Sequence, residues 1–408
     1  MSGTAELSPA QHARIRLHLA LVPAYVGLAA DWVDLARRIA GSRRGLVVTD
    51  FIGIYLDGLI ALRHDAAALY DMTRRSALLN EIAPGAGNLR YPPFYGPQLS
   101  MVFSPLARLP YQTALDVWMA CSLGIYVACG LAVWSTCARL RDNRAATTLL
   151  LLGNPALYYL LGFGQISAVA LLCVTLAFFA LRANRPFLGG LAIGSLAYKP
   201  TLALVFAIVW IGASMKRGRS EERWLVAGVF AAAAAQFVAA AMFWGPAMIA
   251  DYLRAQTVLV PDMRDQFYVH HLHSWRSFFE ILGLPGAVAI PLYIVFAAVS
   301  VAVALRAWLS GAPTAVRFAI LLIATVVASP HIYVFDLVIL MPAYLLLWDA
   351  FGGAKAIEWL LYLSYFAPRF AIVALVAHVQ LSVPALTTLG LMVTKAEKPR
   401  GVPRTIGR

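Results

Sequence analysis

The sequence predicts an all-α protein that crosses a membrane many times. Of its 408 residues, 61% are hydrophobic and only 13% are charged, and the mean hydropathy is +0.73. Soluble domains usually contain about 25% charged residues, so an ordinary soluble enzyme is excluded. Each membrane-spanning helix needs about 20 apolar residues, and we therefore expect about 10–12 membrane passes, two of them short half-spans.

The charge balance and the cysteines do not indicate a nucleic-acid partner, a disulfide framework or a metal site. The chain carries 33 lysine and arginine residues against 20 acidic ones, a formal net charge of +13. A soluble domain with this excess would suggest nucleic acid as a partner. In a membrane protein, however, positive residues gather beside the spans, and we expect contacts with membrane lipids and no nucleic acid. Four cysteines lie inside apolar runs, without disulfide or metal-ligand spacing: Cys121, Cys129, Cys137 and Cys173.

The candidate spans follow one another along the chain. The first apolar run, Ile15 to Ala30, fits a tilted span, with a cleaved signal peptide as the alternative. The later runs cover residues 112–138, 145–161, 166–181, 187–213, 224–244, 286–308, 317–328, 332–348, 356–367 and 370–392. Lys199-Pro200 interrupts one of them, because proline removes a backbone donor and disfavours helix in the preceding residue. We expect two antiparallel half-spans with Lys199 at their outer tip, or else one kinked span.

Basic clusters predict the orientation, because lysine and arginine beside spans stay in the cytoplasm. The clusters are Arg139/Arg141/Arg144, Arg182/Arg185, Lys216/Arg217/Arg219/Arg223, Arg306/Arg317 and a basic tail over residues 393–408. If all of them lie inside, residues 31–111 and 245–285 face outward. The first of these segments also contains arginines, but long loops are largely exempt from the rule. We interpret residues 1–408 as a single membrane domain with an elaborated first outer loop.

Asp50 is the first candidate functional residue. An apolar stretch gives way to Thr49-Asp50 and then to an amphipathic helix that carries Tyr55 and Asp57. Asp50 and Asp57 are seven residues apart, so that both could line one helix face. A carboxylate near apolar walls tends to have a raised pKa and suits a general base. Thr49 or Asp50 could equally be the N-cap of the helix, and the local sequence leaves both readings open.

Other candidates fall on the same predicted side. Residues 91–97 combine three prolines with three aromatic residues, which predicts a rigid aromatic wall for a sugar or lipid, or an interfacial anchor. Lys199 stands at a helix break, and ionisable residues within membrane spans are usually functional. The three histidines of residues 270–273 would need another ligand from elsewhere to hold a metal, so we expect no metal. An ammonium and several histidines near an outer cavity would suit a phosphate head group.

The order of these motifs resembles glycosyltransferase family 87, a group of membrane enzymes with the GT-C architecture that includes mannosyltransferases. The resemblance runs from about residue 45 to residue 350. It rests on Asp50-Phe51 with Tyr55, Tyr91-Pro92-Pro93, Ser104-Pro105-Leu106, Gly164-Gln165, Gly189-Gly190 before Lys199-Pro200, and Ser329-Pro330-His331 with Asp336. It implies inverting transfer of a hexose from a polyprenyl-phosphate donor to a lipid or glycan acceptor. The active site would face the periplasm from a bacterial inner membrane.

The resemblance also implies roles for individual residues. Asp50 is similar to the family's general base, and His331 to the histidine that would contact the donor phosphate or the reacting sugar. Lys199 and Gln165 are similar to the lysine and glutamine of two donor-site elements. We expect further substrate contacts from Tyr55, Asp57, Tyr91, Arg276 and His273. Two features depart from the family: the residues Phe51-Ile52-Gly53 after the aspartate, and the histidine run 270–273.

The absence of a nucleotide-phosphate loop agrees with a lipid-linked donor, and we expect no cofactor. A lipid flippase or transporter would share the composition and the broken helix. It would usually show two related halves, which this sequence does not. A membrane scaffold without chemistry would leave the clustering of Asp50, Lys199 and His331 on one side unexplained.

Overall fold

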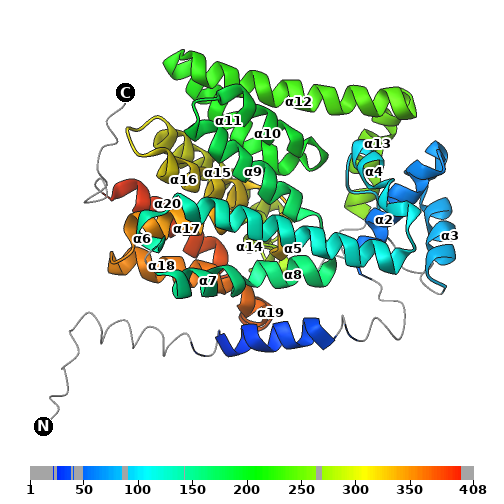
Figure 1. Ribbon diagram of the computed structural model, residues 1–408. Helices are drawn as coiled ribbons and strands as arrows, with labels where there is room; N and C mark the ends of the chain where they lie inside the picture. Colours follow the sequence, from blue (N-terminus) through cyan, green and yellow to red (C-terminus); the bar gives the residue numbers. More distant parts are fainter. Residues whose placement is uncertain are drawn as a thin grey trace, which may run out of the picture.

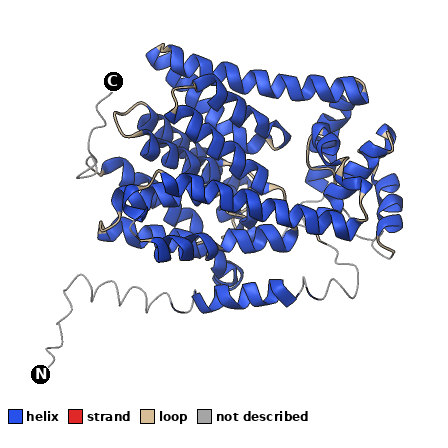
Figure 2. Ribbon diagram, in the orientation of Figure 1, coloured by secondary structure: helices blue, strands red, loops and turns tan. Residues whose placement is uncertain are grey.

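A computed structural model describes most of the chain, namely residues 22, 25–37, 40, 49–84, 91–141, 143–262 and 269–396. Within these ranges the chain is helical and contains no strand beyond an isolated antiparallel bridge between Leu272 and Tyr333 (Figure 2). The predicted all-α class is confirmed. Most of the first apolar run, the signal-peptide alternative and residues 397–408 of the basic tail lie outside the described residues.

The α-helices, labelled in Figure 1, are α2 (Phe51–Leu62), α3 (Met72–Ile82), α4 (Pro97–Phe103), α5 (Tyr111–Ser135), α6 (Ala138–Arg141), α7 (Arg144–Leu152), α8 (Pro155–Phe163), α9 (Ser167–Arg182), α10 (Pro186–Gly194), α11 (Pro200–Arg217), α12 (Ser220–Trp244), α13 (Ala247–Asp262), α14 (Trp275–Ile281), α15 (Gly286–Trp308), α16 (Thr314–Ala328), α17 (Met341–Phe351), α18 (Lys355–Phe366), α19 (Ala371–Ala377) and α20 (Ser382–Lys395). Short 3₁₀ helices connect some of them: η1 (Ala66–Ala68), η3 (Leu106–Arg108), η4 (Ser195–Tyr198), η6 (Val269–His271), η7 (Val334–Leu340) and η8 (Ala367–Phe370). Both predicted outer segments are thus largely helical.

Five helical segments of the described chain are long and apolar enough to cross a membrane. They are α5, α11, α12, α15 and the continuous segment Val334–Phe351. In α15 only 17% of the most apolar stretch is buried, and side chains such as Ile294 and Val295 are exposed. Exposed apolar faces of this kind suit contact with lipid rather than water. The protein is a polytopic membrane protein, and the expected number of passes stays a prediction.

The predicted break at Lys199-Pro200 is confirmed. Helix α10 ends at Gly194, η4 follows, and α11 begins at Pro200, where the missing N–H of proline costs no hydrogen bond. The part after the break is longer than a half-span, since α11 has 18 residues and continues to Arg217. It ends there because Gly218 takes up a left-handed conformation with φ of 64°.

Helices α10 and α12 touch through glycine. A Cβ atom on Gly190 would lie 2.1 Å from the carbonyl oxygen of Leu225, and one on Gly228 would lie 2.3 Å from that of Phe187. Because no side chain fits at these distances, the two backbones pack directly on each other. Small residues at the interface are a common basis of helix association in membranes, where lipid removes the hydrophobic drive for packing. The Gly189-Gly190 element therefore has a packing role.

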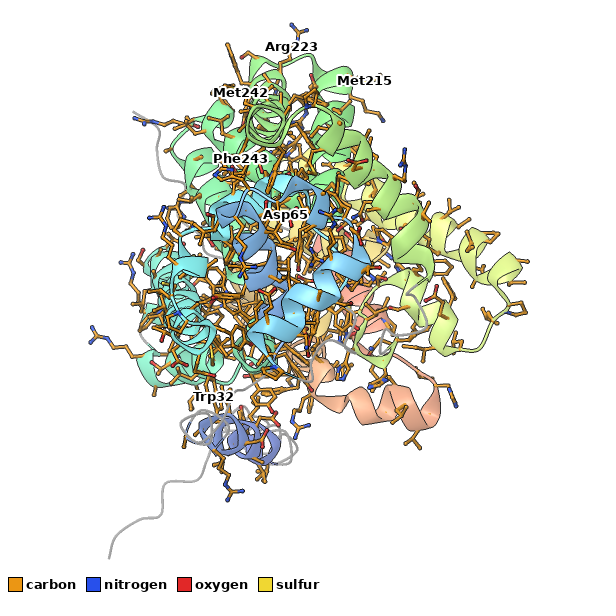
Figure 3. The ribbon with its side chains drawn as sticks, turned by 90° about the vertical axis from the view of Figure 1, so that its right-hand side faces the viewer. Trp32, Asp65, Met215, Arg223, Met242 and Phe243 are labelled. Atoms are coloured by element: carbon orange, nitrogen blue, oxygen red, sulfur yellow. The ribbon has the colours of Figure 1, made fainter. Side chains whose placement is uncertain are left out.

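The first outer segment gathers at one end of the bundle. Helices α2, α3 and α4 lie there beside α13, at the right of Figure 1. Trp244, at the end of α12, donates from Nε1 to the Pro97 carbonyl at 3.3 Å and fixes α12 to α4. Seen from this end (Figure 3), Phe243 lies close to the connection that carries Asp65, and its ring stacks on His64 at 4.9 Å between centroids.

The basic clusters lie toward the other end. Helix α5 runs from the first outer segment to α6, which carries Arg139 and Arg141 (Figure 1). The guanidinium of Arg217, at the end of α11, bonds to the Leu309 carbonyl just after α15. The bundle therefore has two chemically different ends, as the charge pattern predicts. Which end faces the periplasm stays a prediction.

Candidate active site

The carboxylate of Asp50 is not used to cap its own helix. Asp50 directly precedes α2 with helical backbone angles, and its side chain accepts no hydrogen bond from the first turn. Its Oδ2 atom instead accepts a bond of 2.9 Å from Nε2 of Gln165. Burial raises the pKa of Asp50, and the bond from Gln165 opposes that rise because it stabilises the charged form. The side-chain cap that the sequence left open is therefore not formed.

Gln165 is fixed at both its backbone and its side chain. Its carbonyl oxygen accepts a bond of 3.3 Å from the indole N–H of Trp118. Its Oε1 atom accepts a bond of 3.2 Å from the hydroxyl of Tyr95. The preceding residue, Gly164, has φ of +65°, and a Cβ atom there would lie 2.9 Å from that of Phe51. The Gly-Gln element thus supplies a left-handed turn that fits closely against the start of α2.

A second buried carboxylate, that of Asp336, binds Lys199. Nζ of Lys199 lies 2.6 Å from both carboxylate oxygens, and Asp336 is 0% exposed. Ser167 donates to Oδ1 of Asp336 at 2.6 Å, and the backbone N–H of Tyr333 donates to Oδ2 at 3.0 Å. Ser167 is the first residue of α9, so the positive end of the helix dipole also faces this carboxylate.

The beginning of α9 joins the two carboxylates. Gln165 binds Asp50, and Ser167, two residues later, binds Asp336. A second connection runs through Tyr95, which donates to Gln165. The ring of Tyr95 lies 6.1 Å from the ring of Tyr198, the residue before Lys199. Asp50, Gln165 and Lys199, predicted from separate parts of the sequence, therefore belong to one connected polar region.

Asp57 and Tyr55 are engaged inside the protein. Asp57 is 6% exposed and accepts a bond of 2.6 Å from Nη1 of Arg75, which is 2% exposed. The hydroxyl of Tyr55 donates to the Leu109 carbonyl at 2.8 Å. The structure therefore gives both side chains internal partners instead of open positions before a substrate. They connect α2 to α3 and to η3.

Tyr91 lies close to Asp50. Its ring packs against Gly53, where a Cβ atom would come within 3.3 Å of it. Its carbonyl oxygen accepts a bond of 3.2 Å from Nε of Arg75. Burial and the negative charge of Asp50 raise the pKa of Tyr91 to about 12. The departure at Phe51-Ile52-Gly53 thus has a local reason, since Gly53 makes room for the aromatic segment.

The second outer segment contacts the Ser-Pro-His element directly. The N–H of His273 donates to the Ile332 carbonyl at 2.8 Å, beside the bridge between Leu272 and Tyr333. The ring of His331 lies 5.5 Å from that of Tyr333. The histidine run therefore lies next to His331, which is half-buried.

His273 and Arg276 differ in accessibility. His273 is 0% exposed, its Nδ1 lies 2.7 Å from Oγ of Ser382, and burial lowers its pKa to about 3. A neutral, enclosed imidazole offers no positive charge to a phosphate. Arg276 is half-buried and pairs with Glu280 at 3.2 Å on the same helix. Of these two predicted substrate contacts, Arg276 is the one with a side chain open to the outside.

Three residues of this region were not predicted as site residues: Tyr95, Ser167 and Asp336. Tyr95 belongs to the proline-aromatic segment, and Asp336 follows His331 by five residues, so both stood within recognised motifs. Nothing in the sequence marks Ser167 as a partner of Asp336. The described residues contain no group of three or more histidine, cysteine and acidic side chains placed to hold a metal ion, and metal-independent transfer stays a prediction.

A comparison with protein families identifies the chain. The model of glycosyltransferase family 87 matches residues 93–330, which is more than half of the 408 residues. The match includes Gln165 and Lys199, whereas His331 lies directly after its end and Asp50 lies well before its start. No curated protein and no solved structure matches the chain. The chain belongs to glycosyltransferase family 87 and is a membrane glycosyltransferase.

Proposed function

We propose that the protein transfers a hexose, mannose or a similar sugar, from a polyprenyl-phosphate donor to a hydroxyl group of a lipid or glycan acceptor. The transfer inverts the anomeric carbon, takes place on the periplasmic face of a bacterial inner membrane, and uses Asp50 as general base. The observation that carries this proposal is the state of the Asp50 carboxylate. It is half-buried, caps no helix, and is held from the side by a neutral amide.

The chemistry requires one bond to form and one to break. The acceptor oxygen attacks the anomeric carbon from the face opposite the phosphate, while Asp50 accepts the hydroxyl proton. The bond between the anomeric carbon and the phosphate oxygen breaks, and the phosphate leaves with the electron pair. Holding acceptor and donor in line supplies a large part of such catalysis. The raised pKa of Asp50 suits a base, because it strengthens the affinity of the carboxylate for the proton.

The leaving phosphate needs positive charge or hydrogen-bond donors beside it. Lys199 approaches the site with its charge already compensated by Asp336, so it supplies less stabilisation than a free ammonium group would. The further candidates for phosphate contacts are Arg276, in the second outer segment, and His331, in the Ser-Pro-His element that this segment contacts. We assign Lys199 mainly to holding the site together and only secondarily to the donor.

The orientation rests on the two ends of the bundle. Asp50 and the proline-aromatic segment lie at the end that the positive-inside rule places outside, and Arg139, Arg141 and Arg217 lie toward the other (Figure 1). A polyprenyl chain would remain in the bilayer while its phosphate reaches the outer end. The segment at Tyr91 would then serve as a wall for the sugar or the lipid.

The test is sugar transfer by purified protein in liposomes, with synthetic polyprenyl-phosphate hexoses as donors and a bacterial lipid extract as acceptor source. We expect transfer by the wild type and a loss of about 10²-fold or more in Asp50→Asn, the scale of general-base catalysis. Asp116→Asn is the matched control, because Asp116 is exposed and also accepts a glutamine bond, from Gln112 at 3.2 Å. Undiminished transfer by Asp50→Asn would remove Asp50 as the base. Lipid translocation without transfer by the wild type with any donor would favour a flippase.

A further inference from the structure

The amide group of Gln165 has two chemically different ends, and both are engaged. Nε2 donates to Asp50 at 2.9 Å, and Oε1 accepts from the Tyr95 hydroxyl at 3.2 Å. An ionised carboxylate can only accept hydrogen bonds. If the amide turned over, its oxygen would face the Asp50 oxygens, and two acceptors would oppose each other. An ionised Asp50 therefore selects this amide orientation, and the Tyr95 hydroxyl supports it by donating to the amide oxygen.

The residues around this amide leave it little freedom. Gln165 is only 8% exposed, and Trp118 holds its backbone carbonyl. Tyr95 stands in a rigid segment that is itself tied to α13, since Nε2 of Gln256 donates to the Pro93 carbonyl at 3.3 Å. Tyr95 and Gln165 are thus held from α5 and α13, in addition to the close fit of Gly164 against the start of α2.

We infer that Tyr95 and Gln165 are positioning residues that hold the Asp50 carboxylate ionised and oriented toward the acceptor hydroxyl. This inference rests on the proposed role of Asp50 as general base. The two residues act in series, because the Tyr95 hydroxyl bonds to the amide oxygen and the amide nitrogen bonds to Asp50. The interpretation replaces the donor contact expected for Gln165 with a contact to the base.

Several other ionisable groups lie near Asp50, and a substitution at Gln165 does not remove any of them. Burial raises the pKa values of two neighbouring tyrosines, Tyr91 and Tyr95, and the negative charge of Asp50 adds to the rise. The charged groups on the elements packed around it are Asp57 with Arg75, Arg63, Arg108, Asp116, and the Lys199–Asp336 pair beyond Tyr95. A change at Gln165 leaves all these charges in place, so that a shift in the pH profile would report the loss of the hydrogen bond itself.

The sign of the pH effect follows from the donor. A hydrogen bond to the ionised form lowers the pKa of a carboxyl group, and Gln165 lowers that of Asp50. Gln165→Leu should therefore raise the pKa of Asp50, and the acid limb of kcat should move to higher pH. Tyr95→Phe should move the limb in the same direction but less, because the amide remains without its anchor. Gln165→Glu should move it furthest, since two adjacent carboxyl groups resist double ionisation.

The experiment measures kcat and KM against pH in liposomes with one synthetic polyprenyl-phosphate hexose. We expect kcat of Gln165→Leu to fall by about 10²-fold at most, the scale of a misplaced catalytic group, with the KM for the donor unchanged. Tyr95→Phe combined with Gln165→Leu should be no slower than Gln165→Leu alone, because residues in series are not additive. Gln112→Leu and Tyr126→Phe are matched controls, since they remove side-chain hydrogen bonding of the same two residue types away from Asp50.

Each outcome decides the question. A raised donor KM with an unmoved acid limb in Gln165→Leu would overturn the inference and return Gln165 to the donor site. Additive losses in the double variant would also overturn it. If Gln165→Leu does not fold, Tyr95→Phe takes its place, because it removes only one oxygen atom. The position of the acid limb of kcat in Tyr95→Phe then decides between the two outcomes. An active Asp50→Asn enzyme would instead refute the proposed base. If Asp50→Asn is inactive but the acid limb of Gln165→Leu does not move, only the positioning roles of Tyr95 and Gln165 are refuted.

Discussion

The ammonium group of Lys199 lies 2.6 Å from both carboxylate oxygens of Asp336. The pair connects the break between α10 and α11 to η7, 137 residues further along the chain. It is shielded, because the side chain of Lys199 is 14% exposed and that of Asp336 is 0% exposed. A lysine at a proline break, which in the sequence resembles a donor-site group, is here also a structural tie between two halves of the bundle.

Removing one partner of this pair should destabilise the protein strongly. Lys199→Met leaves a buried carboxylate without its cation, which usually costs about 3–5 kcal/mol. We expect a clear loss in the free energy of unfolding in detergent, and a partial recovery in Lys199→Met with Asp336→Leu. The control is Arg63→Met, since Arg63 and Glu81 form an exposed pair with 46% and 56% side-chain exposure and such pairs contribute about 1 kcal/mol or less. Equal effects of the two single substitutions would contradict this prediction.

Arg75 should matter for activity as well as for stability. It bonds to the Asp57 carboxylate, to the Leu69 carbonyl and, through Nε, to the carbonyl of Tyr91. Arg75→Lys keeps the charge but lacks the Nε donor and the planar fork. We expect a folded protein with reduced transfer, because Tyr91 loses its support beside Asp50. Circular dichroism and transfer rates together test this, and full activity of Arg75→Lys would show that the Tyr91 contact is not needed.

Asp50 should reduce stability at neutral pH. Burial raises its pKa in the folded protein, so that the folded state holds the proton more tightly than the unfolded state. The stability contributed by this group is present below the unfolded pKa and is lost as the pH rises through the folded value. Asp50→Asn should therefore melt above the wild type at pH 7, with a smaller difference at pH 4. A melting temperature below that of the wild type at pH 7 would refute the expected sign.

The contact between α10 and α12 should not tolerate a methyl group. Gly190→Ala places Cβ 2.1 Å from a backbone oxygen, and relieving such overlap costs about 1–3 kcal/mol or separates the helices. Gly124→Ala is the control, because a Cβ atom there would meet nothing within 4 Å. We expect a lower melting temperature in detergent for Gly190→Ala alone. Equal melting of both variants would show that the helices can separate without cost.

The parts of the fold that could be predicted are those set by local composition. Apolar runs determine where helices can lie, and the proline at position 200 breaks one of them whatever the tertiary structure. The end of α11 was harder, because the helix continues past the apolar run through Ser214, Lys216 and Arg217, up to the left-handed Gly218. Helix α20 likewise continues to Lys395, past the predicted apolar run that ends at residue 392.

The site could be predicted only as a set of separate motifs. Asp50 and Gln165 stood out by residue type, but their contact joins positions 115 residues apart, and no local pattern specifies such a pairing. The spacing of Asp50 and Asp57 suggested one shared helix face. The structure instead pairs Asp57 with Arg75 of α3. The sequence of α2 alone does not show that α3 will place an arginine there. Tertiary packing, rather than helical periodicity, decides which carboxylate remains available.

The antiparallel bridge at Leu272 takes part in a chain of contacts from His331 to the apolar helix α15. His331 adjoins Tyr333, Tyr333 pairs with Leu272, and three residues later Trp275 begins α14. The indole N–H of Trp275 donates to Ser300 of α15 at 3.3 Å, and only 17% of the most apolar stretch of α15 is buried. If His331 contacts the substrate as proposed, a few packed contacts link the substrate to a helix whose exposed apolar side chains suit lipid. The proposed reaction would then depend on the thickness and fluidity of the bilayer.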